Sequence, residues 1–307
     1  MFAFLVKHIT RLNTQKTLIT TDGSQVWCSS SKDTSSLAPC DHEEADTRMI
    51  LHLADAVNDG FQKILLRTVD TDVVVLAIAA AANLDIQELW VAFGVGHQFR
   101  FIPAHSIAEF LGQEKSKALP LFHAYTGCDT VSSFNTRGKK TAWDTWNAFE
   151  EVTPTLLSLS EGPTDIVEED IATLERFTIL MYDRTSTLVN IDQTRQELFT
   201  KKGRPMDAIP PTRGALVQHI KRAVYQGGHC WGGMFKSIMD MPSPGNWGWT
   251  DPPNWKPLWT TLPEASIASR ELLHCGCKKG CRGRCACKKA ALKCTALCQC
   301  SGKLCDI

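Results

Sequence analysis

The apolar positions between residues 45 and 93 follow two periods, which predict alternating helices and strands. Met49 and Leu53 recur at helical spacing. The runs Ile64–Val69 and Glu88–Phe93 are short and rich in aliphatic and β-branched residues, as buried strands are. A helix is expected between them, over Val73–Ala82. This alternation predicts an α/β fold.

Downstream of residue 153 the pattern is helical. Apolar residues predict helices over 171–181 and 191–199, and Pro210-Pro211-Thr212 opens a third that runs to Tyr225. Residues 242–263 combine six prolines with four tryptophans, a composition that excludes a regular helix or a central strand. Tryptophans in such a segment are expected to pack against a neighbouring domain, and stacking on bases is the alternative.

Five carboxylates stand near the ends of the predicted elements. Asp70 and Asp72 follow the strand 64–69, Glu44 and Asp46 precede the helix that carries Met49, and Asp129 follows a glycine turn. Ligands bind at the carboxyl ends of strands in α/β sheets, and converging carboxylates repel one another unless cations lie between them. Oxygen ligands suit Mg²⁺ or Mn²⁺. The alternative is structural, because acidic residues commonly cap helices or occupy their first turn.

A basic turn follows this region and provides a candidate phosphate contact. It comprises Arg137, Gly138, Lys139, Lys140 and Thr141. A glycine turn that opens a Lys/Thr-rich helix directs backbone N–H groups and cations outward, which suits a phosphate. The turn is not a P-loop, because Ser133 stands where that pattern requires glycine.

Cysteine usage marks the C-terminal end as a separate module. Nine of the 13 cysteines follow residue 274, with the spacing Cys-x-Cys-x3-Cys-x3-Cys-x-Cys-x6-Cys-x3-Cys-x-Cys-x4-Cys. The segment has too few large apolar residues to fold by burial alone, so a metal must supply its stability. Nine thiolates suit about three tetrahedral Zn²⁺ if some sulfurs bridge. The expected ligands are Cys275, Cys277, Cys281, Cys285, Cys287, Cys294, Cys298, Cys300 and Cys305.

Charge distinguishes the same segment from the rest of a chain whose formal net charge is zero. Residues 270–307 contain nine Lys and Arg against two acidic residues. Part of this surplus offsets a cluster charge of about −3, and the rest predicts a polyanion partner. Arg282, Arg284, Lys288 and Lys289 are the candidate DNA contacts. The alternative is a zinc-stabilised module that binds protein instead of DNA.

The order of the acidic and basic motifs over about residues 42–146 resembles the flap endonuclease (5′ nuclease) branch of the PIN-like superfamily. The resemblance rests on Glu44-Ala-Asp46, Asp70-Thr-Asp72, Gly127-Cys-Asp129 and Arg137-Gly-Lys-Lys-Thr-Ala142. It implies a PIN-like core with a central, mainly parallel sheet. It also implies that Glu44, Asp46, Asp70, Asp72 and Asp129 bind two divalent metals, and that Gly138 to Thr141 touch DNA phosphates within a helix-turn-helix. The family has a further aspartate on its first strand, for which this chain has no equivalent before residue 42.

The cysteine pattern resembles the CXC modules of tesmin-like proteins, Polycomb methyltransferases and male-specific-lethal proteins. In these modules nine cysteines hold three zincs, and several of the modules bind DNA. Tesmin-like repeats carry a tyrosine just before a Cys-x-Cys pair, where this chain has Arg284. That tyrosine's contact with the minor groove is therefore not carried over.

Together the motifs predict the organisation of the chain. The expected segments are an N-terminal, truncated remnant of the core over 1–41, a PIN-like core over 42–152, a helical region over 153–241, a Pro/Trp-rich segment over 242–269 and a CXC zinc module over 270–307. The whole resembles a mobile-element-associated, transposon-derived protein family. No apolar run approaches the length of a membrane span, so no membrane partner is expected.

The function expected from both resemblances is a nuclear, divalent-metal-dependent DNA-processing nuclease with a zinc DNA-binding tail. DNA is the expected partner, with chromatin proteins as further candidates. One alternative is a non-catalytic DNA- or chromatin-binding protein with a degenerate nuclease core. Another is a phosphohydrolase of the haloacid dehalogenase kind, with Asp70 of the Asp-x-Asp pair as nucleophile.

Overall fold

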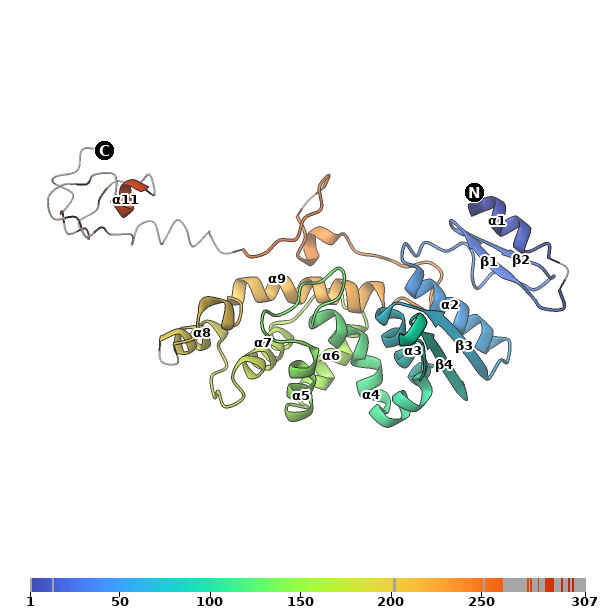
Figure 1. Ribbon diagram of the computed structural model, residues 1–307, viewed down its shortest axis with the longest axis horizontal. Coiled ribbons are helices and arrows are strands. Elements are labelled where there is room, and N and C mark those ends of the chain that lie inside the picture. The colour runs from blue at the N-terminus through green and yellow to red at the C-terminus, as the bar shows by residue number, and fades with distance from the viewer. Residues whose placement is uncertain are drawn as a thin grey trace. The chain divides into compact units, whose positions relative to one another are not determined.

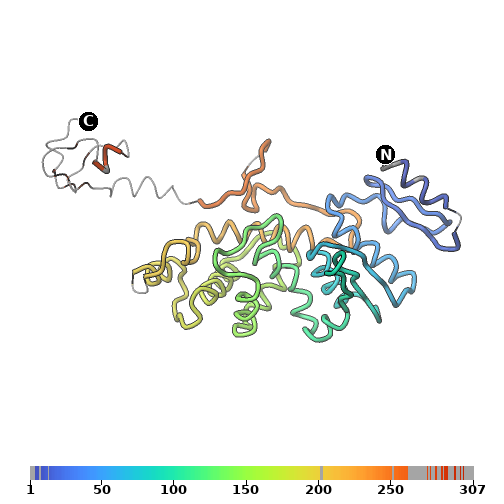
Figure 2. Tube along the Cα trace, viewed as in Figure 1, coloured from blue at the N-terminus to red at the C-terminus, as the bar shows by residue number. Residues whose placement is uncertain are grey.

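The computed structural model divides the chain into two compact units, Met1–Thr260 and Thr261–Ile307. In the first unit it describes residues 2–12, 14–200, 203–250 and 252–260 (Figures 1 and 2). In the second it describes residue 261, residues 285–289, and the cysteines at 275, 277, 281, 294, 298 and 300. No helix in these ranges has the length and apolar character needed to cross a membrane.

A three-stranded sheet of order β3-β4-β5 organises the first unit. Its strands are Lys63–Thr68, Glu88–Phe93 and Arg100–Pro103. β3 and β4 are parallel, with α3 as their crossover, whereas β4 and β5 are antiparallel. The short turn between β4 and β5 is too brief for the crossover that a parallel pair needs. The predicted α/β class is therefore confirmed, but the described sheet is small and mixed rather than mainly parallel.

Three helices pack beside this sheet, and two of them position the acidic residues. They are α2 (Ala45–Asn58), α3 (Thr71–Asn83) and α4 (Ala104–Tyr125). α3 buries Ala77, Ala79 and Ala80, and small side chains let neighbouring helices approach closely. α4 is long, although Gly112 interrupts it with a φ of 78°.

The helical region belongs to the same hydrophobic core as the sheet. It contains α6 (Val152–Ser160), α7 (Glu168–Tyr182), α8 (Ile191–Thr200) and α9 (Arg213–Val224), and α5 (Lys139–Ala148) precedes it. α7, α8 and α9 confirm the three helices expected after residue 153. Leu156, Phe177 and Leu216 belong to one buried cluster with Ile50 of α2. The segments 42–152 and 153–241 consequently form one body.

The first 41 residues pack against α2. They contain α1 (Phe2–Ile9) and the hairpin of β1 (Ile19–Asp22) and β2 (Gln25–Cys28). A small cluster in which Leu37 and Cys40 pack with Leu51 attaches this region to the helix.

The chain returns to the start of α2 immediately after α9. Figure 2 shows this orange segment beside the blue one. His42 donates from Nε2 to the carbonyl of Lys236 at 2.6 Å, and Asp41 accepts from the backbone N–H of Met239 at 2.9 Å. The connection begins with a π-helix, Tyr225–Cys230. Segments almost 200 residues apart in the sequence therefore meet beside the predicted site.

Glycines permit this close return. A Cβ on Gly228 would lie 2.4 Å from the carbonyl oxygen of Leu159, and one on Gly232 would lie 2.5 Å from that of Ser160. Real Cβ atoms do not come this near to a backbone oxygen. The π-helix consequently lies directly against α6.

The tryptophans of the Pro/Trp-rich segment differ in their surroundings. Trp247 is buried and its ring meets that of His229 at a centroid distance of 4.5 Å. Trp259 is 62% exposed. Trp247 is thus packed within the first unit, whereas Trp259 contacts α9 through Arg222 and stays largely exposed.

His219 on α9 is buried in its neutral form. Its Nε2 donates to the carbonyl of Tyr125 at 2.8 Å, and its Nδ1 accepts from the hydroxyl of Ser132 at 3.2 Å. Burial lowers the pKa of this imidazole from 6.5 to about 4, because desolvation disfavours the charged ring. The folded protein therefore does not take up a proton at His219 until the pH falls near 4.

The contribution of His219 to stability should fall as the pH drops from about 6.5 toward 4, because the unfolded chain takes up a proton at His219 that the buried ring does not take up. The loss from this residue is about 3 kcal/mol in the free energy of unfolding. His219→Gln keeps a donor for Tyr125 and removes the titration, so its denaturant unfolding should depend less on pH over this interval. His97→Gln, at an exposed position, serves as the control. Parallel pH profiles for wild type and His219→Gln would contradict this assignment.

Candidate functional site

Three of the predicted carboxylates come together where α2 and α3 begin. Carboxylate oxygens of Asp46, Asp70 and Asp72 lie within 4.8 Å of one another, so the group could hold a metal ion. Asp46 lies in the first turn of α2 and Asp72 in the first turn of α3. Asp72 is buried and the other two are partly exposed. The sheet and its crossover helix thus place the three side chains at one end of two adjacent helices.

Asp70 caps α3 and also belongs to this group. Its Oδ1 accepts from the backbone N–H of Asp72 at 2.8 Å. An N-cap of this kind leaves the second carboxylate oxygen available for another ligand. The structural and functional interpretations of Asp70 are therefore compatible.

Electrostatics link all five predicted carboxylates. Desolvation raises the pKa of Asp46 to about 6, and repulsion from Asp70, Glu44, Asp72 and Asp129 adds to the shift. Glu44 and Asp129 lie outside the group of three, but they are near enough to act on it. A cation at the centre would relieve this repulsion.

Glu44 is held by donors from the returning segment. Gln226 donates from Nε2 to both carboxylate oxygens at 3.2 Å, and Trp231 donates from Nε1 to Oε2 at 3.3 Å. The other end of the Gln226 side chain accepts from the hydroxyl of Thr130 at 2.9 Å. Gln226 therefore connects the start of α2 to the loop that carries Asp129.

Gln226 and Trp231 were missed by sequence reasoning. The available signal was the pair of Gly-Gly dipeptides, Gly227-Gly228 and Gly232-Gly233, around them. Repeated glycine within a helical pattern indicates close approach of two backbones.

His123 is a second residue that the sequence did not reveal. It lies in the last turn of α4 and donates from Nε2 to Oδ1 of Asp72 at 2.9 Å. Both side chains are largely buried. A hydrogen bond of this kind orients the Asp72 carboxylate and leaves its other oxygen free to face the group of three.

The basic turn lies close to the acidic group, and the amine of Lys139 is hydrogen-bonded within the protein although the residue is exposed. Its Nζ donates to the carbonyls of His123 at 3.0 Å and Gly127 at 2.6 Å, and to the Thr126 hydroxyl at 3.1 Å. Burial lowers the pKa of this amine. Lys139 therefore ties the loop of Asp129 to the end of α4 in place of the outward position expected from the sequence.

The other residues of the basic turn differ in their contacts and exposure. The guanidinium of Arg137 lies 4.9 Å from the ring centroid of Tyr182, and Gly138 is the N-cap of α5. Lys140 is exposed and pairs with Asp144 at 3.3 Å, and Thr141 lies beside it in the first turn. Lys140 is the member of this turn that solvent reaches most freely.

A cavity of about 600 Å³ gives access to one side of the acidic group. Asp72, Asp129, His123, Lys139 and Trp259 contribute to its walls. Asp129 is thereby brought to the same cavity as Asp72. A polar polymer could reach the carboxylates along this wall.

In the second unit the cysteines form overlapping groups of four. The Sγ atoms within each group lie within 4.8 Å of one another, and the groups are Cys275, Cys277, Cys281 and Cys285; Cys275, Cys285, Cys287 and Cys294; and Cys275, Cys294, Cys298 and Cys300. The Sγ of Cys275 lies 3.8 Å from those of Cys294 and Cys300. This separation matches the edge of a tetrahedron of thiolates around one metal, ~3.8 Å for bonds of ~2.3 Å.

Three cysteines recur among these groups. Cys275 belongs to all of them, and Cys285 and Cys294 belong to two each. Sharing of this kind is required where each of several metals takes four thiolates but the chain offers fewer than four thiolates per metal. Lys288 and Lys289 are exposed on α11 (Ala286–Lys289), whereas Cys305, Arg282 and Arg284 lie outside the described residues.

None of the family models, curated proteins and solved structures compared with this chain matches it. Functional assignment therefore starts from the acidic group and the cysteine groups. Both could hold metal ions.

Replacing one carboxylate should make the metal-free protein more stable and less responsive to metal. Asp46→Asn removes a charge that its neighbours repel, and we expect the free energy of unfolding without divalent metal to rise by about 1 kcal/mol, a figure reduced for solvent screening. Added Mn²⁺ should raise the melting temperature of wild type more than that of Asp46→Asn. Asp22→Asn, in the hairpin turn, is the matched control. Equal responses of Asp46→Asn and wild type to Mn²⁺ would show that the acidic group does not bind the ion.

Proposed function

We propose that the first unit is a divalent-metal-dependent DNA nuclease of the flap or 5′ nuclease type and that the second unit is a zinc module that binds DNA. The observation that carries the nuclease proposal is the group of Asp46, Asp70 and Asp72, whose carboxylate oxygens lie within 4.8 Å of one another. Oxygen-only donor sets of this kind suit Mg²⁺ or Mn²⁺. Desolvation and the repulsion from neighbouring carboxylates, which together raise the pKa of Asp46, support the same interpretation.

Bound divalent ions would supply an activated water and charge neutralisation at the leaving oxygen of a phosphodiester. Asp46, Asp70 and Asp72 would hold them, with Asp129 at the edge of the same cavity. Both oxygens of Glu44 already accept N–H bonds. Its contribution is therefore negative charge beside the ions rather than a free ligand oxygen.

The surrounding residues hold these carboxylates in place. His123 orients Asp72, Gln226 ties Glu44 to Thr130, and Lys139 ties the Asp129 loop to the end of α4. Each restraint comes from a different element. A fixed arrangement of ligands lowers the cost of reorganisation when the ions and the substrate bind.

The overlapping cysteine groups support the proposal for the second unit. An all-thiolate donor set favours Zn²⁺ over Mg²⁺ or Mn²⁺. The exposed Lys288 and Lys289 add positive charge beside the cluster. Such a surface suits a phosphate backbone.

The nuclease proposal predicts that Asp70→Asn abolishes cleavage without unfolding the protein, because asparagine retains the cap of α3. We expect cleavage of flap and single-stranded DNA with Mg²⁺ or Mn²⁺ to fall by more than about 100-fold. Asp22→Asn should cleave as wild type does. The proposal fails if Asp70→Asn keeps wild-type cleavage, or if wild type hydrolyses only small phosphomonoesters.

The zinc proposal predicts about three Zn²⁺ per chain by elemental analysis. Cys285→Ser removes a sulfur that two groups share, so more than one zinc should be lost, together with binding to duplex DNA. Cys28→Ser lies in the hairpin of the first unit and should leave both unchanged. Duplex affinity that survives removal of the zinc by a chelator would contradict the role of the module.

A further inference from the structure

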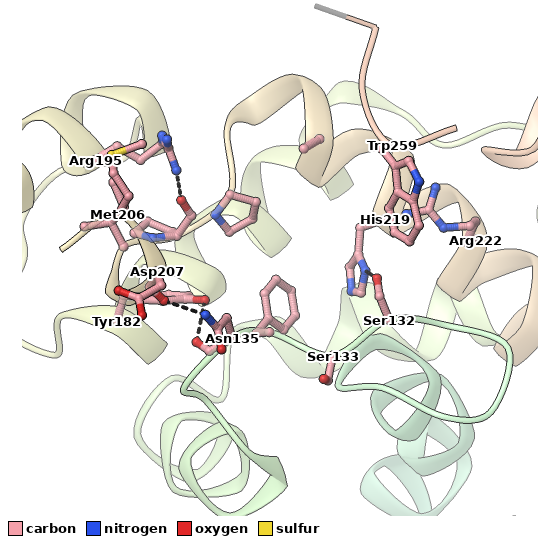
Figure 3. Close-up of a pocket in the computed structure, with 15 residues that line it drawn as sticks. Ser132, Ser133, Asn135, Tyr182, Arg195, Met206, Asp207, His219, Arg222 and Trp259 are labelled. Carbon is pink, nitrogen blue, oxygen red and sulfur yellow. Dashed lines mark hydrogen bonds between the residues drawn. The ribbon is translucent and has the colours of Figure 1, made fainter. Parts of the chain in front are cut away.

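A second chamber adjoins the acidic cavity. It has a volume of about 270 Å³ and shares Ser132, Ser133 and Trp259 with the cavity beside Asp72. Figure 3 shows its lining, with His219, Arg222 and Trp259 at one end and Tyr182 and Arg195 at the other. A ligand that occupies one space can therefore extend into the next.

The chamber offers flat, apolar surfaces. Phe134 and Pro211 contribute to its lining, and Trp259 lies at one end with 62% of its surface exposed (Figure 3). Arg222 holds this indole, since its guanidinium lies 5.3 Å from the ring centroid and donates to the carbonyl of Leu258 at 2.7 Å. An exposed indole held from behind by a cation is suited to stacking on another flat ring.

The surroundings of Trp259 differ from those of Trp247 in the same segment. Trp247, in the same segment, is 5% exposed and packs on His229, as an indole that serves only to fill space does. Trp259 is 62% exposed and faces the chamber.

The charge of the chamber is opposite to that of the neighbouring acidic group. Arg195 and Arg222 line it, and Asp207 is its single acidic residue among those described. Arg137 and Arg204 lie just behind, where both donate to the carbonyl of Tyr182, at 3.5 and 2.7 Å. Guanidinium groups near flat apolar surfaces suit a ligand that carries both phosphates and aromatic rings.

Polar atoms complete the lining without favouring one hydrogen-bond pattern. The amide of Asn135 donates to the carbonyl of Asp207 at 2.8 Å and is exposed on its other side. Ser132 and Ser133 are exposed hydroxyls, which both donate and accept. This mixture accommodates the edge of any base.

We propose that this chamber binds an unpaired base of a DNA strand whose neighbouring phosphodiester lies at the acidic group, with Trp259 as the stacking surface. The choice of DNA rests on the proposed nuclease function. The volume of about 270 Å³ is at the lower limit of ligand pockets, ~300 Å³, and suits one base rather than a base pair. The substrate class is therefore single-stranded DNA, or a single-stranded arm next to a duplex.

The test measures binding of the full chain to a short, fluorescein-labelled single-stranded oligonucleotide, with Ca²⁺ as the divalent ion. Trp259→Ala should weaken binding by about 5- to 100-fold. Trp259→Phe retains a ring and should restore most of the affinity. Trp255→Ala removes an exposed tryptophan of the same segment that lines neither cavity, and it should bind as wild type does.

An abasic scan separates stacking from binding by the zinc module. Wild type should lose affinity when one particular base is removed from the oligonucleotide, whereas Trp259→Ala should show no further loss at that position. Affinity for blunt duplex DNA, which reports on the zinc module, should be equal in both. The proposal for the chamber is overturned if Trp259→Ala binds as wild type does and loses the same affinity as wild type when the base is removed.

Failure of the chamber and failure of the nuclease proposal give different results. If wild type cleaves DNA but Trp259→Ala binds and cleaves normally, the proposal that the chamber binds a base is wrong and the nuclease proposal stands. If no variant cleaves DNA but Trp259→Ala loses the base-dependent affinity, the chamber stands as a single-strand binding site.

Discussion

Mutual repulsion among Asp46, Asp70 and Asp72 is the constraint on which the rest of the first unit depends. The starts of α2 and α3 supply part of the compensation, because helix N-termini favour negative charge. The Asp72 N–H and His123 add hydrogen bonds. These contacts do not offset the whole cost, since the pKa of Asp46 is still raised to about 6. A group kept close at such a cost by buried packing is typical of a site that binds cations.

The same constraint explains why the chain folds back on itself after α9. A carboxylate beside three others needs donors, and Glu44 receives them from Gln226 and Trp231, more than 180 residues away in the sequence. Such donors can approach only where the backbone itself comes close. Gly228 and Gly232 allow this, because any side chain there would meet the carbonyls of α6. The helical region is thus part of the site and not an appendage to a nuclease-like core.

Local signals were sufficient to predict most of the elements and the three clustered aspartates, but not α1, β5 or α6. The spacing of apolar residues predicted the strand before Asp70 and the helix after it. It also predicted the helices that contain Phe177 and Leu216. His123 and Gln226 could not be predicted, because a single polar residue in a helix has no periodic signature and each partner lies at least 51 residues away. Lys139 was expected to face solvent, but the carbonyls at the end of α4 need donors and take its amine. Composition likewise could not separate Trp247 from Trp259, which differ only in what surrounds them.

The zero net charge of the chain is the sum of an acidic first part and a basic C-terminal part. Residues 1–269 carry 24 Lys and Arg against 31 Asp and Glu, and the later residues are strongly basic. A polyanion approaching the first unit therefore meets net negative charge, with Arg195 and Arg222 as a local exception beside the acidic cavity. Divalent cations at Asp46, Asp70 and Asp72 would invert the sign of that cavity and join it to the arginine-lined chamber as one continuous favourable path. Under the proposed function, DNA binding by the first unit should depend on divalent ions, whereas DNA binding by the second unit should depend on zinc. The two contributions should therefore respond to different ions.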